Sequence, residues 1–302
     1  MEDVVLSSLE TVAELNRRIP RILRAVVGLF GLSDDGRAIA KGTGVLVRIG
    51  SRRLVFTASH VVTGTTGAAL PTVLCLFPLG ANSEAVTGCF LPPQMFDVSS
   101  SSIVWMNKEL DVAVLAIPEL EEIPVSRFVD GEGDAIITRT KLKPRWREFT
   151  SDDAYVPFMV CGFPNLGVDI DFDNRCHIVS CLPSIAEISS WDDSVWTPGD
   201  HPPPQCHFDL SSIDSSPAAP DLSPWDTHIE QATRLTPSEI ENEAFGGISG
   251  GPVFCIETGE FLCALVKEGG RVFGPVRVIA SSWDDVYYAF LDAELNLNRS
   301  AR

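Results

Sequence analysis

Three side chains, which occur in the order His60, Asp111 and Ser249, are of the types that acyl transfer requires. A hydroxyl nucleophile needs a base to take its proton, a group that fixes the tautomer of that base, and N–H donors that face the developing oxyanion. His60 can supply the base, Asp111 the orienting carboxylate and Ser249 the nucleophile. The backbone N–H groups of Gly247 and Ser249 lie in a glycine-rich stretch and can supply the oxyanion donors. This set predicts hydrolysis of a peptide bond through an acyl-enzyme.

Each of the three residues taken alone also has a plain structural explanation. A histidine at the end of a strand, such as His60, is commonly structural, and an aspartate before a strand, such as Asp111, is commonly a turn or cap residue. A Gly-Ser-Gly sequence is commonly only a turn. The presence of all three in one chain, in this order, favours the catalytic interpretation.

The segments that carry these residues resemble motifs of the chymotrypsin-like (trypsin-fold) serine peptidases. TASH at 57–60 is similar to the histidine motif of that family, DVAVL at 111–115 to its aspartate motif, and GISGGP at 247–252 to its G-[DN]-S-G-G-P motif. With GTGVL at 42–46, the likeness runs from about Arg21 to Ala280. It implies two six-stranded antiparallel barrels, with His60 and Asp111 in the first and Ser249 in the second. It also implies a serine endopeptidase that acts on a protein or peptide substrate and needs no cofactor.

The sequence departs from the family pattern at two places. Ile248 precedes the serine, where secreted digestive members carry an acid that pairs with a newly freed N-terminus, so activation by N-terminal cleavage is not expected. Lys267-Glu268-Gly269 replaces the usual Ser-Trp-Gly. We expect the backbone of this segment, from Lys267 to Gly269, to pair with substrate, although its side chains give the pocket a different shape.

Glu243 is a candidate for primary specificity. It stands six residues before Ser249, where an acid lies at the base of the pocket in Arg- or Lys-cleaving members. A carboxylate there can pair with a basic side chain, which gives the hypothesis of cleavage after Arg or Lys. The alternative is that Glu243 belongs to a displaced surface loop with other acids at 237–244.

Short strands must position these residues. Strand-like runs separated by Gly, Ser and Asp clusters are typical of antiparallel hairpins, and they predict an all-β fold of closed barrels or a sandwich. The runs are 21–32, 42–49, 53–57, 72–77, 102–105, 111–117, 135–138, 156–162, 251–256, 260–267 and 276–281. We predict one peptidase domain over 21–302, with a first barrel over 21–140 and a second over 141–281.

Two helices and one irregular segment complete the predicted organisation. Apolar residues at three- and four-residue steps predict an N-terminal helix over 1–20, ended by Pro20. A C-terminal helix over 282–302 is predicted to begin at a Ser282 cap. The stretch 189–237 is rich in Pro, Ser and Asp, and we interpret it as a long surface insertion of the second barrel.

Composition excludes several classes of partner. The apolar content of 45% is that of a folded protein, and 41 acidic against 23 basic residues give a net charge of −18. Such a charge disfavours nucleic acid and anionic membrane surfaces, and no apolar run approaches the roughly 20 residues that cross a bilayer. The acidic start Met1-Glu2-Asp3 is unlike a secretory signal, so we expect a cytoplasmic protein whose eight cysteines are reduced. Secretion of a trimmed form would reverse the expectation for the cysteines.

Other constellations are weaker. One half of the chain contains several possible zinc ligands, namely Cys176-His177, His201 and Cys206-His207. Their spacing matches no paired C-x-x-C pattern, so no metal is expected. Cys161 as a nucleophile lacks a partner motif. Two further alternatives stay open: a non-catalytic binding module on the same scaffold, and a latent enzyme. In the latent enzyme, the N-terminal helix or the 189–237 insertion covers the cleft until a regulatory protein or effector relieves the block.

Overall fold

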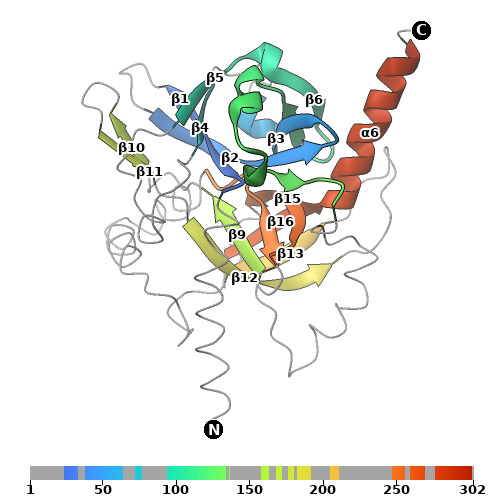
Figure 1. The fold of residues 1–302 in the computed structure, drawn as a ribbon. Coiled ribbons are helices and arrows are strands. Elements are labelled where there is room, and N and C mark those ends of the chain that lie inside the picture. Colours follow the sequence, from blue (N-terminus) through green and yellow to red (C-terminus); the bar gives the residue numbers. More distant parts are fainter. Residues whose placement is uncertain are drawn as a thin grey trace.

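The computed structural model describes residues 24–32, 38–63, 72–76, 94–133, 136, 158–162, 168–171, 176–179, 182–191, 205–210, 247–255, 259–268 and 276–300. In this part of the chain the secondary structure is mostly β-strand, with few helices. Figure 1 shows one sheet, coloured blue to green, above a second sheet, coloured yellow-green to orange. The expectation of a mostly-β chain is confirmed.

The first sheet has eight strands, seven of which lie in the spatial order β5-β4-β1-β2-β3-β7-β6. Their bounds are β1 Val26–Leu32, β2 Ala38–Ile49, β3 Arg52–Ala58, β4 Thr72–Leu76, β5 Gln94–Val98, β6 Ile103–Asn107, β7 Val112–Leu115 and β8 Val129–Asp130. Neighbours on the path are antiparallel, and β8 pairs in parallel with β2. The register of β3 and β7 sets Ala58 opposite Val112, so the end of β3 lies beside the start of β7.

The second sheet closes into an antiparallel barrel in the order β12-β13-β16-β15-β14-β9. Its strands are β9 Phe158–Gly162, β12 Leu182–Trp191, β13 Cys206–Leu210, β14 Val253–Cys255, β15 Phe261–Glu268 and β16 Val276–Ser282, and a separate pair is β10 Val168–Asp171 with β11 Cys176–Val179. The prediction of two six-stranded barrels is therefore not confirmed as stated. The barrel has six strands, whereas the first sheet has eight, and its path has no closing pair among the described residues.

The interpretation of 189–237 as one surface insertion is wrong in part. Residues 189–191 are the last residues of β12. Strand β13 belongs to the barrel, where it pairs with β12 on one side and with β16 on the other. Cys206 and Phe208 are buried while His207 between them is half-buried, which is the two-residue alternation of a strand with one face on the core. The proline-rich run before it concealed this short strand in the sequence. Residues 192–204 and 211–237 lie outside the described residues, as does the predicted N-terminal helix over 1–20.

The strands that position the candidate site are buried on both faces. In β3, Leu54 and Phe56 belong to one core cluster, and Val55 between them belongs to another. β7 alternates between the same two clusters. One cluster contains residues of the first sheet and of the segments 61–62 and 117–123, while the other also contains residues of β9, β14 and β15 and so joins the sheet to the barrel. Burial on both faces explains why β3 and β7 have continuous apolar sequences.

The described helices are few and mostly short. The α-helices are α2 Ser59–Thr63 and α6 Trp283–Ser300, and the 3₁₀-helices are η2 Ser100–Ser102, η3 Pro118–Glu122 and η4 Val125–Arg127. None of them combines the length and the apolar character that a membrane-crossing helix needs.

Helix α6 packs against both the first sheet and the barrel (Figure 1). The Ser282 hydroxyl accepts a hydrogen bond from the backbone N–H of Asp285 at 3.4 Å and donates to its carboxylate at 2.7 Å, which confirms the predicted N-cap. The centroid of the buried Trp283 ring lies 5.0 Å from the ring centroid of Phe56 in β3 and 5.2 Å from that of Phe261 in β15. This indole therefore contacts both the first sheet and the barrel edge to face.

Candidate active site

Strands β3 and β7 place His60 and Asp111 side by side. Helix α2 begins directly after β3, so His60 stands just past the end of that strand, while Asp111 is the residue before β7. The pairing of Ala58 with Val112 brings both residues to the same end of the sheet. The backbone N–H of Ser59 donates to the Asp111 carbonyl at 3.0 Å, which extends the pairing beyond the strands.

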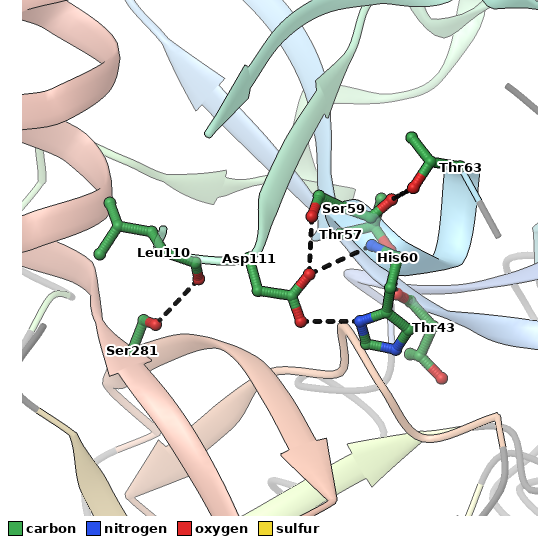
Figure 2. Close-up of polar contacts among 8 residues, drawn as sticks. All are labelled: Thr43, Thr57, Ser59, His60, Thr63, Leu110, Asp111 and Ser281. Atoms are coloured by element: carbon green, nitrogen blue, oxygen red, sulfur yellow. Dashed lines mark hydrogen bonds and ion pairs between the residues drawn. The ribbon is translucent and has the colours of Figure 1, made fainter. Parts of the chain in front are cut away.

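The carboxylate of Asp111 accepts three hydrogen bonds. Oδ2 accepts from Nδ1 of His60 at 2.7 Å, and Oδ1 accepts from the Ser59 hydroxyl at 2.7 Å and from the backbone N–H of His60 at 3.1 Å. Figure 2 shows these contacts, with the second ring nitrogen of His60 pointing away from Asp111. Because an ionised carboxylate only accepts, it favours the tautomer with the proton on Nδ1 and leaves Nε2 to act as a proton acceptor.

Asp111 has a backbone conformation that L-residues rarely adopt. Its φ of 54° lies in the left-handed region, which residues other than glycine rarely occupy, although aspartate tolerates it better than most. Neighbouring contacts hold it there: Leu110 is buried, and the Leu110 carbonyl accepts a hydrogen bond from the Ser281 hydroxyl of β16 at 3.3 Å (Figure 2). Backbone strain of this kind is found where a fold holds a side chain in a functional position.

The surroundings of Asp111 favour its charged form. The side chain is 22% exposed, and that of His60 is 46% exposed. Burial by itself would raise the pKa of Asp111, but the hydrogen bonds from His60 and Ser59, together with the charge of His60, outweigh burial and hold the pKa below its ordinary value. Asp111 is therefore ionised at neutral pH and can accept the Nδ1 proton.

Ser249 lies in a turn that is bound to both sheets. Thr43 of β2 donates its backbone N–H to the Ser249 carbonyl at 2.8 Å and its hydroxyl to the Gly247 carbonyl at 2.7 Å. On the barrel side, the Pro252 carbonyl accepts from the backbone N–H of Cys161 in β9 at 3.1 Å. Since Thr43 and Gly247 are buried, little water competes for these hydrogen bonds.

The glycines of this turn allow it to lie directly on the first sheet. Gly247 and Gly250 have φ values of 98° and 85°, which glycine adopts without a steric cost. A Cβ on Gly250 would lie 2.2 Å from the Thr43 carbonyl oxygen and 2.8 Å from the backbone nitrogen of Ala58. Ala58 precedes His60 by two residues, so the turn that carries Ser249 lies against the strand end that carries His60.

The structure joins two of the three predicted catalytic residues by a direct contact. His60 and Asp111 are hydrogen-bonded, whereas no hydrogen bond within the described part of the chain links His60 to Ser249. In the same part of the chain, the backbone N–H groups of Gly247 and Ser249 have no acceptor. Their role as donors to an oxyanion stays a prediction.

Ile248, the residue before Ser249, is buried against the barrel. It is 5% exposed, and a Cβ on Gly162 of β9 would lie 2.8 Å from the Ile248 Cα. Apolar packing therefore holds this position of the turn.

The predicted substrate-binding residues are only partly described. Lys267 is in β15, opposite Ile279 of β16. Glu243 and Gly269 lie outside the described residues. The pairing of the Lys267–Gly269 segment with substrate, and the preference for Arg or Lys, stay predictions.

The weaker candidates do not converge on one place. Cys176 and His177 are in β11, in the small two-stranded sheet, whereas Cys206 and His207 are in a barrel strand. Among the described residues, no three His, Cys, Asp or Glu side chains are grouped so that they could hold a metal ion, and His201 lies outside these residues. The side chain of Cys161 on β9 is fully buried, which does not suit a nucleophile that must meet a substrate.

Two residues that the sequence motifs do not mark as functional lie in the site. Ser59 donates to the Asp111 carboxylate, and Thr43 donates to the carbonyls of Gly247 and Ser249. The signals available in the sequence were a hydroxyl directly before His60 and a hydroxyl between two glycines.

No protein-family model matches this chain, and no curated protein matches it. Among solved structures, the chain is similar to the MamO protease domain from Magnetospirillum magneticum, with 13% identity, a TM-score of 0.47, and coverage of 89% of this chain and 96% of that chain. It is also similar to the thermostable serine protease AL20 from an extremophilic microorganism, with 12% identity, a TM-score of 0.39, and coverage of 87% of this chain and 93% of that one. Both TM-scores lie below 0.5.

Proposed function

We propose that this chain is a serine endopeptidase of the trypsin-like fold, which hydrolyses protein or peptide substrates with Ser249, His60 and Asp111 as its triad. The observation that carries the proposal is the 2.7 Å contact between Nδ1 of His60 and Oδ2 of Asp111, made beside the turn that contains Ser249. A carboxylate bound to Nδ1 orients an imidazole as the general base for a serine hydroxyl. The closed barrel and the neighbouring eight-stranded sheet support the proposed fold.

In the proposed reaction, Oγ of Ser249 attacks the scissile carbonyl carbon while Nε2 of His60 takes the hydroxyl proton. The carbonyl oxygen becomes an oxyanion, which accepts hydrogen bonds from the N–H groups of Gly247 and Ser249. The C–N bond then breaks as His60 gives its proton to the leaving amine, which yields an acyl-enzyme. Water, deprotonated by His60, attacks this ester, and the proton returns to Ser249 as the acid product leaves. Asp111 stays ionised and stabilises the imidazolium that forms twice in the cycle.

The first step brings Oγ of Ser249 to within about 3 Å of Nε2 of His60. Since no hydrogen bond joins the two residues within the described residues, we propose that binding of substrate closes this contact. Catalytic contacts are often long without substrate and shorten in its complex.

The same observation favours a second candidate, a binding module that has the scaffold but does not complete the triad. The two candidates differ in the reactivity of Ser249. A nucleophile in an assembled site reacts with a fluorophosphonate, whereas an ordinary surface serine does not.

The test is labelling of the folded protein with a fluorophosphonate probe, followed by peptide mapping. We expect label on Ser249, no label in Ser249→Ala, and labelling slower by about 10⁴-fold or more in His60→Ala. Ser51→Ala, which removes an exposed serine in the turn between β2 and β3, is the matched control and should label as wild type does. A folded wild-type protein that stays unlabelled, also after addition of peptide substrates, would support the binding module instead.

A further inference from the structure

We propose that Ser59 is a positioning residue of this site, whose hydroxyl holds Oδ1 of the Asp111 carboxylate so that Oδ2 faces His60. The inference rests on the proposed function, in which Asp111 orients the His60 base. It assigns a role to a side chain that touches neither the nucleophile nor the base.

Ser59 is bound to Asp111 at two points. Its hydroxyl donates to Oδ1 at 2.7 Å, and its backbone N–H donates to the Asp111 carbonyl at 3.0 Å. The distance from the hydroxyl is short, as expected for a bond to a charged acceptor. Ser59 itself is held in place, because it is 6% exposed and its carbonyl accepts a hydrogen bond from the Thr63 hydroxyl at 2.9 Å.

The two oxygens of the carboxylate have different partners. Oδ1 accepts from the Ser59 hydroxyl and from the backbone N–H of His60, while Oδ2 accepts, among the described residues, only from Nδ1 of His60. The terminal torsion of an aspartate is broad and roughly two-fold, so contacts must select its orientation. Without the hydroxyl, Oδ1 would keep only the longer bond of 3.1 Å from the His60 N–H. The carboxylate would then turn more easily, and the imidazole that it holds would turn with it.

The surroundings leave this role to a hydroxyl. Within the described part of the chain, the side chains that hydrogen-bond to the Asp111 carboxylate are those of His60 and Ser59. Burial is the largest single effect on the pKa of Asp111 and raises it, but the hydrogen bonds from His60 and Ser59, together with the charge of His60, lower it by more. Ser59 contributes because its hydroxyl donates to the ionised form.

The test compares Ser59→Ala with Ser102→Ala. Ser102 is a suitable control because it is also a buried serine of the first-sheet region, 8% exposed, and its hydroxyl accepts a hydrogen bond from the Ser99 N–H at 3.2 Å and does not contact Asp111. For hydrolysis of a fluorogenic peptide library, we expect Ser59→Ala to lower kcat about tenfold, as for the loss of a bond to a charged group, with KM changed by less than about twofold. Ser102→Ala should leave both constants as in wild type.

Two NMR measurements report on the site without catalysis. With carbon-labelled aspartate, we expect the carboxyl resonance of Asp111 to titrate at higher pH in Ser59→Ala than in wild type, because the ionised form has lost a donor. We also expect the Nδ1 proton resonance of His60 to broaden and to exchange faster with water. Ser102→Ala should move neither signal.

The outcomes separate the two proposals. If wild type shows no hydrolysis or labelling but Ser59→Ala still moves both NMR signals, the positioning role holds and the peptidase proposal fails. If wild type hydrolyses peptides and Ser59→Ala changes neither kcat nor the signals, the positioning role is overturned and the peptidase proposal stands. If Ser59→Ala fails to fold while Ser102→Ala folds, the hydroxyl is structural, and the positioning role is overturned as well.

Discussion

Replacement of Gly250 by alanine tests whether the Ser249 turn lies as closely on the first sheet as the structure has it. Gly250 has a φ of 85°, and an alanine there would have a left-handed backbone that costs about 1–2 kcal/mol. The new Cβ would also lie 2.2 Å from the Thr43 carbonyl oxygen and 2.8 Å from the Ala58 nitrogen, both of which are backbone atoms of paired strands. Such overpacking typically costs about 1–3 kcal/mol more. We expect Gly250→Ala to lower the free energy of unfolding by about 2–5 kcal/mol.

Gly259 provides the matched control. Its φ is 72°, also in the left-handed region, but a Cβ there would meet no atom within 4 Å. Gly259→Ala should therefore cost only the backbone term of about 1–2 kcal/mol. Urea denaturation of wild type and both variants gives the three free energies of unfolding, and fluorophosphonate labelling shows whether the turn still presents Ser249. Equal losses of stability in the two variants would refute the close contact between the turn and strands β2 and β3.

Two further predictions concern the contacts around the same site. The lowered pKa of Asp111 means that its contribution to stability is present above the ordinary aspartate pKa of about 3.9 and is lost as the pH falls through its value in the folded protein. Between pH 6 and pH 3, wild type should therefore lose more unfolding free energy in urea than Asp111→Asn does, and equal losses would contradict this. Thr43→Val removes the hydroxyl bond to the buried Gly247 carbonyl and should cost about 1–3 kcal/mol in the same assay, with slower labelling of Ser249. Ser102→Ala, which removes a buried hydroxyl that contacts Ser99 and lies outside the site, should not slow the labelling, and a similar rate loss in both variants would count against the Thr43 contact.

Local sequence determined many of the elements and the candidates for catalysis. The apolar runs of β3 and β7 are recognisable because both faces of these strands are buried, and the Ser282 cap of α6 depends on residues three apart. The types of side chain needed for acyl transfer are likewise a local property, so His60, Asp111 and Ser249 could be named before any geometry was known. Strand β13 could not, because its five residues follow a proline-rich run and are stabilised as a strand by pairing with β12 and β16.

Tertiary structure alone decided how these residues meet. The bond from Thr43 to Gly247 joins residues 204 positions apart, and the bond from Ser59 to Asp111 joins residues 52 positions apart. No local pattern encodes such contacts, since they depend on the register of β3 against β7 and on how the barrel packs against the first sheet. The left-handed backbone of Asp111 has the same origin, because the buried residues Leu110 and Val112 on either side hold it in a conformation that an isolated chain rarely adopts.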